Sequence, residues 1–236
     1  MRITKATPKA IEHACKTFHY SKSVPAVQYA YNVYNDADEW CGCIVYGGGA
    51  NNNLAKSFGK NSGEVLELER VALNGKQEHT SQAVAMTLKQ LHKDNPLVQM
   101  VVSYSDHRQK HLGTIYQATN WIYLGLTVTS DTQYYWKGKW THERTINAQK
   151  NRDELKKKLP KRENSNKFKY VFCFNKKERK QYLKLAQPYP KDKDLTSCEM
   201  QVEEKRLSNA WTTSSTQRTT SQEDDMSLKT LSETGT

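Results

Sequence analysis

The N-terminal part of the chain alternates between short apolar segments and polar turns. After a short predicted strand, Thr7 offers a side chain that can cap a helix, and Pro8 stands at the first helical position. These two residues predict a helix over about residues 8–17. Residues 27–34 and 41–46 are rich in aromatic and β-branched residues, and the polar turn between them predicts a β-hairpin.

Beyond the hairpin, apolar strands and amphipathic helices continue to alternate. The segment VLELERVAL alternates in part and predicts a strand, and a long helix follows with Thr80 or Ser81 as its cap. The later predicted elements are strands at 98–104, 122–128, 132–136 and 169–174, and helices at 113–119 and 176–186. Residues 122–128 and 132–136 are expected to close the sheet. This order predicts an α/β or α+β architecture, a mixed central β-sheet flanked by helices, with a C-terminal strand–helix extension.

Composition separates the C-terminal end from the rest of the chain. Hydrophobic residues make up 36% of the sequence, but 10% are aromatic, which is too many for a wholly disordered chain. Residues 207–236 account for much of the low apolar fraction, because 14 of these 30 residues are Ser or Thr. We expect a globular domain over residues 1–140, a basic extension packed on it over 141–190, and a disordered, Ser/Thr-rich acidic tail over 191–236.

The formal net charge of +11 is concentrated in one block. Residues 191–236 carry a net charge of −3, whereas residues 1–190 carry +14. Within the latter, residues 137–184 hold 17 Lys and Arg against 5 Asp and Glu, a net charge of +12. Such a block attracts phosphate backbones, and the aromatic residues interleaved with it suit stacking on nucleobases. A nucleic-acid partner is therefore favoured over a merely solvated basic face or a membrane surface.

Two further features bear on the environment of the chain. No apolar stretch reaches the length of a membrane span, and the N-terminus lacks the apolar core of a secretory signal, so a soluble, cytoplasmic protein without a membrane partner is expected. The chain has five cysteines, including the pair Cys41 and Cys43, but no second pair that would complete a zinc site. Reduced thiols in the core are the expected state.

Three polar clusters fall in predicted loops. The first is His19 and Tyr20 after the first helix, the second is residues 103–107 at the end of an apolar strand, and the third is residues 113–121. Ligands of open α/β sheets gather beyond the carboxyl ends of strands. A carboxylate there, with a nearby Tyr and His, suits a general base or a metal ligand. Each residue alone is more often structural, so the functional interpretation depends on their occurring together.

The string SDHRQKHLGTIYQATNWIYLG, residues 105–125, closely resembles the central motif of the Mom family of phage DNA-modification proteins. Shorter segments also resemble parts of that family: FHYS at 18–21, ELER at 67–70, KFKYVF at 167–172 and YPK at 189–191. The resemblance is collinear over about residues 1–191. It implies a fold related to the GNAT acetyltransferases, with residues 1–140 as the catalytic domain.

The resemblance also implies an activity and its residues. The implied activity adds a carbamoylmethyl (acetamido) group to N6 of adenine in DNA, which protects phage DNA from host restriction in the bacterial cytoplasm. Carried over position by position, the implied catalytic residues are His19, Tyr20, Asp106 and Tyr116. The candidates for binding substrate or cofactor are Arg70, Ser103, Ser105, Asn120 and Trp121.

The implied ligands are a metal, a group donor and DNA. Iron is the implied metal, with His19, Tyr20 and Tyr116 as its ligands. The donor is either acetyl-CoA or a glycine-derived compound, as a small molecule or on a carrier. GNAT enzymes hold the CoA pyrophosphate on a Gly-rich turn at a helix N-terminus, and the equivalent residues 74–81 have a single glycine and an acidic residue.

Double-stranded DNA is the expected macromolecular partner. Adenine N6 is hidden in a base pair, so we expect the base to be extruded, with Asp106 removing its proton. Rings that could stack on it are Trp121, Tyr123 and Trp136. The candidate DNA-binding residues are Lys156, Lys157, Lys158, Lys161, Arg162, Lys167 and Lys169.

Two other functions remain open on the sequence. One is a GNAT acetyltransferase that acts on protein or small-molecule amines, which tight acetyl-CoA binding and acetyl transfer without DNA would indicate. The other is a non-catalytic nucleic-acid-binding protein, for which the substitutions Asp106→Ala and Tyr116→Phe would leave every activity unchanged.

Overall fold

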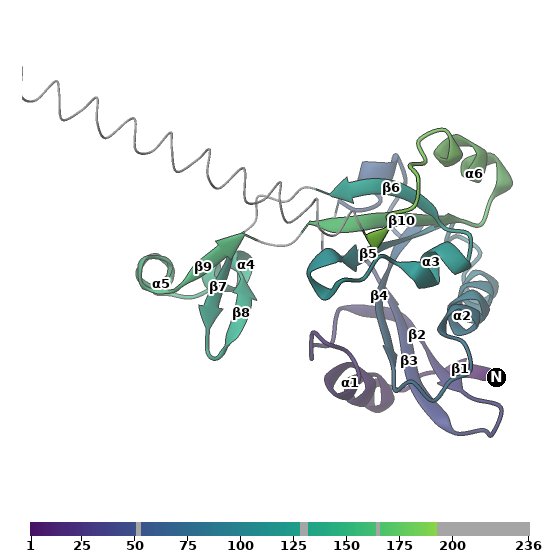
Figure 1. Cartoon of the computed structure of the whole chain (residues 1–236), viewed down its shortest axis with the longest axis horizontal. Coiled ribbons are helices and arrows are strands. Elements are labelled where there is room, and N and C mark those ends of the chain that lie inside the picture. The colour runs from purple at the N-terminus through teal and green to yellow at the C-terminus, as the bar shows by residue number, and fades with distance from the viewer. Residues whose placement is uncertain (51–52, 128–131, 164–165, 193–236) are drawn as a thin grey trace, which may run out of the picture. The chain divides into compact units, whose positions relative to one another are not determined.

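A seven-stranded mixed sheet forms the centre of the fold in the computed structural model (Figure 1), which describes residues 1–50, 53–127, 132–163 and 166–192. Its strands are β1 Arg2–Lys5, β2 Val27–Tyr34, β3 Trp40–Gly47, β4 Val65–Leu73, β5 Met100–Asp106, β6 Ile122–Thr127 and β10 Lys167–Cys173. They lie in the order β1-β2-β3-β4-β5-β10-β6. The pair β4–β5 is parallel and the other pairs are antiparallel. This sheet, flanked by helices, confirms the predicted architecture.

Helix α1, Pro8–Thr17, begins where the sequence predicts. The Thr7 hydroxyl oxygen accepts a hydrogen bond from the Ala10 N–H at 3.3 Å, and Pro8 lies in the first turn. The buried face of the helix packs on β3 and β4, and this cluster includes Ile11, Ala14, Cys15, Cys43, Val45 and Ala72. The local signals in the sequence therefore agree with the tertiary contacts that the helix makes.

Helix α2, Thr80–Asp94, covers the opposite face of the sheet from α1. The Tyr46 hydroxyl lies 2.8 Å from the Thr87 hydroxyl of α2, whereas the preceding residue, Val45, packs against α1. Successive strand residues point to opposite faces, so the two helices are on opposite sides of β3. The N-cap of α2 is His79 and not Thr80 or Ser81 as predicted, because the Thr80 hydroxyl accepts a bond from the preceding loop instead.

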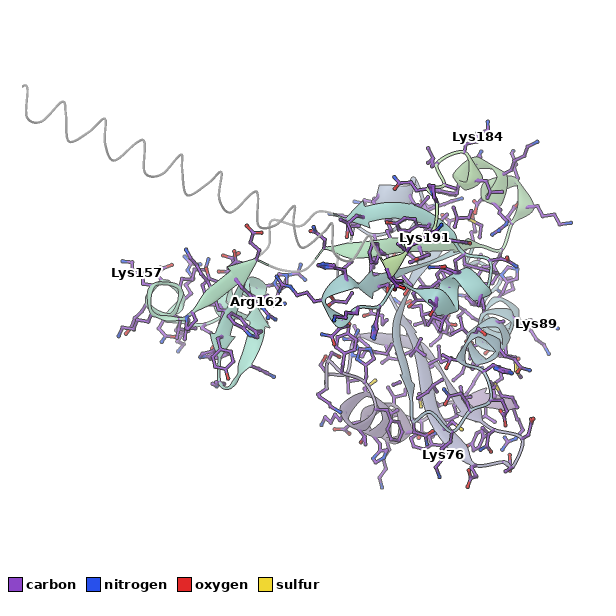
Figure 2. The ribbon with its side chains drawn as sticks, viewed as in Figure 1. Lys76, Lys89, Lys157, Arg162, Lys184 and Lys191 are labelled. Atoms are coloured by element: carbon purple, nitrogen blue, oxygen red, sulfur yellow. The ribbon has the colours of Figure 1, made fainter. Side chains whose placement is uncertain are left out.

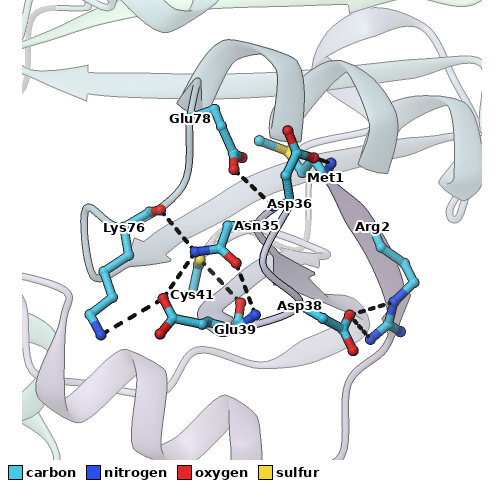
Figure 3. A network of polar contacts seen from close by, with 9 residues as sticks. All are labelled: Met1, Arg2, Asn35, Asp36, Asp38, Glu39, Cys41, Lys76 and Glu78. Atoms are coloured by element: carbon cyan, nitrogen blue, oxygen red, sulfur yellow. Dashed lines mark hydrogen bonds and ion pairs between the residues drawn. The ribbon is translucent and has the colours of Figure 1, made fainter.

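The β2–β3 hairpin is confirmed, and its turn is bound to the loop that precedes α2 (Figure 3). The Asn35 side-chain amide donates to the Lys76 carbonyl at 3.3 Å. The Asp36 N–H donates to the Glu78 carboxylate at 2.8 Å. These bonds fix the loop between β4 and α2 against the hairpin, which matters for what that loop can bind.

Strand β10 lies inside the sheet, between β5 and β6. It pairs antiparallel with both, and its pairing with β5 runs from Lys167 opposite Asp106 to Cys173 opposite Met100. The compact unit accordingly runs over Met1–Tyr189 and includes β10, which lies in the predicted extension 141–190. The reason is that β10 supplies the hydrogen-bonding partner of two strands at once. Helix α6, Lys176–Leu183, follows it at the predicted place.

A second sheet of three strands holds most of the basic block. Its strands are β7 Thr132–Trp136, β8 Lys139–His142 and β9 Lys161–Glu163, in the order β8-β7-β9, with helices α4 Glu143–Asn147 and α5 Arg152–Lys158. The prediction that residues 132–136 close the main sheet is wrong. The turn at Lys137 and Gly138, both with positive φ, reverses the chain directly into β8, so β7 pairs within its own hairpin.

Three other expectations concern thiols, membranes and the tail. The cysteines at 15, 41, 43 and 173 are buried free thiols, as predicted. Within the described ranges, no helix combines the length and apolar character needed to cross a membrane. The predicted disordered tail, residues 191–236, lies outside the described residues except for its first two.

Candidate active site

The parallel strands β4 and β5 diverge after three register pairs. These pairs are Val65 with Met100, Leu66 with Val101 and Glu67 with Val102. A bulge accompanies the divergence, since Leu68 and Arg70 pair with consecutive residues of β3 and leave Glu69 between them without a register partner. Bulges of this kind re-aim side chains and are common beside active sites. Polar residues of both strands and of two loops meet at this point.

Ser103 of β5 bridges the two diverging strands. Its hydroxyl donates to the Leu68 carbonyl of β4 at 3.0 Å, and the Tyr116 hydroxyl oxygen lies 2.8 Å from the same Ser103 oxygen. Both Ser103 and Tyr116 are buried. The contact therefore brings α3, Thr114–Ala118, to the point where the strands separate.

Tyr116 is held by aromatic neighbours and by the glycine that starts its helix. Its ring centroid lies 5.0 Å from that of Trp121 and 5.1 Å from that of Tyr170. Gly113 has φ 75°, and a Cβ there would lie 2.5 Å from the Tyr170 ring, so no larger residue fits. Burial raises the pKa of Tyr116 to about 12, which keeps its phenol protonated at neutral pH.

His19 and Tyr20 lie in the loop after α1 and stack on each other. Their ring centroids are 4.3 Å apart, and the Tyr20 ring also meets His111 edge-on at 5.9 Å. The Nδ1 atom of His19 accepts the Ser21 N–H at 3.2 Å. Burial, and after it the charge of Arg70, lowers the pKa of His19 to about 4. The imidazole is therefore neutral at pH 7.

Arg70 ties this loop to β4. Its guanidinium donates to the Ser23 carbonyl at 3.4 Å and to the Ser23 hydroxyl at 3.3 Å. A third bond, at 2.6 Å, runs to the carbonyl of Glu69 in the bulge. Arg70 thus fixes the approach of the His19 loop and places a permanent positive charge beside it.

Asp106 ends β5 on the same side. Its carboxylate accepts the Arg108 N–H at 3.0 Å and caps the short 3₁₀ helix η2, His107–Gln109. Partial burial, and after it the charge of Asp106, raises the pKa of the half-exposed Tyr20. The four implied catalytic residues therefore lie at one end of the diverging strands, and their roles remain predictions.

The site also contains two carboxyl groups that the sequence analysis does not assign. Burial, and after it the charge of Glu69, raises the pKa of Glu67 to about 7. Burial likewise raises the pKa of Glu69, whose carboxylate accepts the Gly49 N–H at 3.1 Å. The signal in the sequence is a pair of acidic residues, followed by Arg70, in the strand-forming segment VLELERVAL. Half-buried acids with a raised pKa are typical of functional sites.

The glycine run after β3 is shaped by these two acids. A Cβ at Gly49 would lie 2.7 Å from a Glu67 carboxylate oxygen, and one at Gly47 would lie 2.8 Å from a Glu69 carboxylate oxygen. The backbone approaches both carboxyl groups as closely as glycine allows. The run GGG, residues 47–49, is therefore a part of the site.

Three candidate binding residues make structural contacts. The Ser105 hydroxyl donates to the His111 carbonyl and so orders the loop after β5. Asn120 lies at the start of β6, which the register aligns with the opposite end of β5, and its carbonyl accepts a bond from Arg179 at 2.8 Å. Trp121 is fully buried. The burial of Trp121 leaves its ring no surface for a ligand, whereas the binding role of Asn120 stays a prediction.

Two of the three predicted stacking rings need the same correction, while Trp136 is half-buried in β7, with Lys137 4.4 Å from its ring centroid. Trp121 and Tyr123 are buried in the core, because both pack against the aromatic residues of β10. Neither ring has a face that an extruded base could reach. Tyr20 is 49% exposed, so its ring is open to solvent at this site.

The implied iron ligands are His19, Tyr20 and Tyr116. In the ranges that the structure describes, no group of three or more His, Cys, Asp or Glu residues is placed to hold a metal. The Tyr116 hydroxyl is engaged with Ser103. These observations lend no support to iron, and iron binding by His19, Tyr20 and Tyr116 stays a prediction.

The loop before α2 does not fit a bound pyrophosphate either. A cradle for that group presents free N–H groups and positive charge at a helix N-terminus. Here Glu78 directly precedes the cap of α2, and Lys76 lies 4.0 Å from Glu39 (Figure 3). These carboxylates oppose a second anion.

The candidate DNA-binding residues, of which Lys157 and Arg162 are labelled in Figure 2, differ in their contacts. Lys156 and Lys158 form ion pairs with Glu143 and Glu154 at 2.6 Å and 2.7 Å. Lys169 lies 4.3 Å over the Phe58 ring, and burial lowers its pKa. Of the other candidates, Lys157 and Lys161 are exposed, and Arg162 and Lys167 are half-buried.

Comparisons with known proteins agree with the resemblance in the motifs. The model of the Mom protein family matches residues 1–191. The methylcarbamoylase Mom of Escherichia phage Mu is 28% identical over 189 residues, which are 75% of this chain and 78% of that protein. A solved acetyltransferase of Bacillus subtilis in complex with CoA is similar at 9% identity, with a TM-score of 0.42, over 74% of this chain and 99% of that one. The family match includes every residue of the site described above.

Proposed function

Because the chain belongs to the Mom protein family, we propose that it is a DNA-modification enzyme that attaches a carbamoylmethyl group to N6 of adenine and so protects phage DNA from restriction. One observation carries the proposal: separate segments of the chain bring His19, Tyr20, Arg70, Asp106 and Tyr116 to the divergence of β4 and β5. The name of the phage Mu relative, methylcarbamoylase, supports the group that is transferred.

The chemistry sets what the site must supply. The lone pair of adenine N6 is delocalised into the ring, which makes the amine a poor nucleophile. In the proposed step, N6 forms a bond to the CH₂ carbon of the donor, and the bond from that carbon to its leaving group breaks with the electron pair. The N6 proton passes to a carboxylate of the enzyme. Acetyl transfer from acetyl-CoA would instead join N6 to a carbonyl carbon.

We assign the acceptance of that proton to Glu67. A general base works best when its pKa is near the working pH, and the pKa of Glu67 is about 7. Asp106 has a different environment, at the end of β5 beside Tyr20, where its charge can orient the amine. Two carboxyl groups with unlike surroundings are a common basis for dividing acid–base roles.

The remaining groups bind and polarise. Tyr20 and Tyr116 keep their protons, so each can donate a hydrogen bond to the carbonyl of the carbamoyl group or to the leaving group. Arg70 stabilises negative charge that develops as the leaving group departs. The exposed ring of Tyr20 offers a surface on which the extruded adenine can stack, which offsets part of the few kcal/mol that extrusion costs.

The test is nucleoside mass spectrometry of plasmid DNA from bacteria that express the chain. Carbamoylmethyl-adenine is the expected product, and it differs from acetyl-adenine by one NH unit in mass. The double variant Asp106→Ala, Tyr116→Phe serves as the inactive control at matched expression. Unmodified deoxyadenosine alone, from cells that contain the folded protein, would refute the proposal. Acetyl-adenine, or acetylated peptides formed without DNA, would favour the acetyltransferase alternative.

A further inference from the structure

The three-stranded sheet β8-β7-β9 has one covered face and one exposed face. Tyr134 is buried, together with Thr141 directly across from it and Ile146 of α4. The next residue, Tyr135, is 44% exposed. Since successive strand residues point to opposite faces, α4 covers the Tyr134 side and leaves the Tyr135 side to solvent.

The exposed face carries an ordered aromatic surface. Tyr135 and Trp140 are cross-strand partners, with ring centroids 5.4 Å apart, and Trp140 is 38% exposed. The Arg162 guanidinium lies 4.2 Å from the Trp140 ring centroid and donates to the Gln133 side chain at 2.9 Å. Register and hydrogen bonding therefore hold two rings and one cation on the same side of the sheet. We call these three residues, Tyr135, Trp140 and Arg162, the platform.

The charge around the platform suits a polyanion. Residues 132–163 contain 10 Lys and Arg against 4 Asp and Glu. Lys157 of α5, which is labelled in Figure 2, and Lys161 of β9 are exposed. A patch of exposed aromatic side chains on a protein surface often marks a binding site. Cations at the edge of such a patch can neutralise the phosphates of a nucleic acid.

We infer that the platform binds an unpaired base of a DNA strand by stacking, while the surrounding cations contact its phosphates. A fully paired duplex hides the faces of its bases, so flat exposed rings gain most from unpaired nucleotides. The inference rests on the proposed function in one respect: extrusion of an adenine leaves unpaired nucleotides for the platform to hold. The stacking role goes beyond attraction by charge, because positive charge alone would not favour single strands over duplex DNA.

The first test measures binding of the full chain to labelled DNA by fluorescence anisotropy. The probes are a single strand of about 15 nucleotides and the duplex of the same sequence. For the double variant Tyr135→Ala, Trp140→Ala, we expect single-strand affinity to fall about tenfold and duplex affinity to change less than about twofold. Trp140→Phe keeps a ring and should retain most of the single-strand affinity. Tyr34→Ala is the matched control, because Arg2 lies over the Tyr34 ring in the same way at 4.1 Å.

Unchanged single-strand affinity in the double variant would overturn the inference, as would an equal decrease for single strand and duplex. A second measurement is independent of variant folding: photocross-linking of a bromodeoxyuridine-substituted single strand to the unmodified chain, mapped by mass spectrometry. We expect cross-linked peptides within residues 133–142, and cross-links confined to other segments would refute the platform. Neither readout requires a modified nucleoside, so the platform and the proposed activity can fail separately.

Discussion

The Tyr116 hydroxyl oxygen lies 2.8 Å from Ser103 Oγ, at the point where β5 parts from β4. The Ser103 hydroxyl donates to the Tyr116 oxygen, and the Leu68 carbonyl lies within hydrogen-bond distance of the same hydroxyl at 3.0 Å. Tyr116 is therefore the acceptor in its contact with Ser103, and that contact does not use its own proton. A buried phenol with a pKa of about 12, held beside two diverging strands, can direct that proton toward a bound ligand.

Replacing Tyr116 by Phe tests this role directly. The rings of Trp121 and Tyr170 still pack against the Phe ring, so we expect the free energy of unfolding to fall by no more than about 1–2 kcal/mol. The modified adenine per cell should fall at least about tenfold, because Phe cannot donate a hydrogen bond to the reacting group. Thermal unfolding and nucleoside mass spectrometry measure the two effects. Ser103→Ala, which leaves the Tyr116 hydroxyl in place, should reduce modification less, and full activity in Tyr116→Phe would exclude the role.

Glu67→Gln tests the proton acceptor. The carboxylate must be ionised to accept a proton, so modification by the parent protein should rise with pH through about 7, the pKa of Glu67. The Gln variant keeps the size of the side chain but cannot ionise, and we expect activity to fall about a hundredfold with no inflection near 7. The measurement is the rate of adenine modification in vitro over pH 5–9. If the pH–rate profile of Glu67→Gln kept its inflection near pH 7, another residue would be the base. Asp106→Asn would then be the next variant to measure.

The same carboxyl group makes a prediction about stability. Its pKa in the folded protein is about 7, above the ordinary Glu value of 4.5, so the folded state binds the proton more tightly than the unfolded state. Its contribution to stability is therefore greatest below pH 4.5 and declines as the pH rises to 7, by up to about 3 kcal/mol. In urea unfolding, the free energy of unfolding of Glu67→Gln should rise relative to that of the parent between pH 4.5 and 7. Above pH 7 this difference should stay constant. Glu12→Gln is a control of opposite sign, since Lys16 lowers the pKa of Glu12.

Prediction from sequence succeeded where the deciding interactions are local. Helix α1 is marked by Thr7 and Pro8, which act within one turn, and the β2–β3 hairpin is marked by two β-branched, aromatic segments around a short turn. The position of β10 between β5 and β6 depends on pairing between segments far apart in the chain, so no local pattern reveals it. The displacement of β7 into a separate sheet has the same origin.

The site could be predicted in part for a similar reason. His19, Tyr20, Asp106 and Tyr116 stand in motifs that resemble one family, and the structure brings them to one end of β4 and β5. Glu67 and Glu69 were missed because their significance depends on burial and on a bulge, and alternation in VLELERVAL reveals neither. Trp121 was misplaced because an aromatic residue in a motif looks the same whether it packs in the core or faces a ligand.

Gly113 is expected to control the position of Tyr116. Alanine there must adopt φ 75° and place its Cβ 2.5 Å from the Tyr170 ring, so the start of α3 has to move. We expect Gly113→Ala to reduce the free energy of unfolding by about 2–4 kcal/mol and to abolish most of the modification activity. Gly75→Ala is the matched control, because Gly75 has φ 85° but nothing within 4 Å of the added Cβ. The free energy of unfolding of Gly75→Ala, measured by chemical denaturation, should fall by only about 1 kcal/mol. Equal decreases in the two variants would show that the strain of positive φ, and not the clash with Tyr170, causes the loss of stability.

The basic block is expected to set the salt dependence of DNA binding. The tested variant replaces five cations by Gln, namely Lys156, Lys157, Lys158, Lys161 and Arg162. For each phosphate that the variant no longer neutralises, the slope of log affinity against log salt should decrease by about 0.9. Because Lys156 and Lys158 already pair with carboxylates, most of the change should come from the other three, and a variant of those three alone should reproduce it.

A control that replaces five exposed lysines of the main sheet region, Lys9, Lys16, Lys56, Lys89 and Lys93, removes the same charge and should leave most of the slope. Equal slopes for the two five-residue variants would show that net charge alone attracts the DNA, and that the block has no special role in binding it.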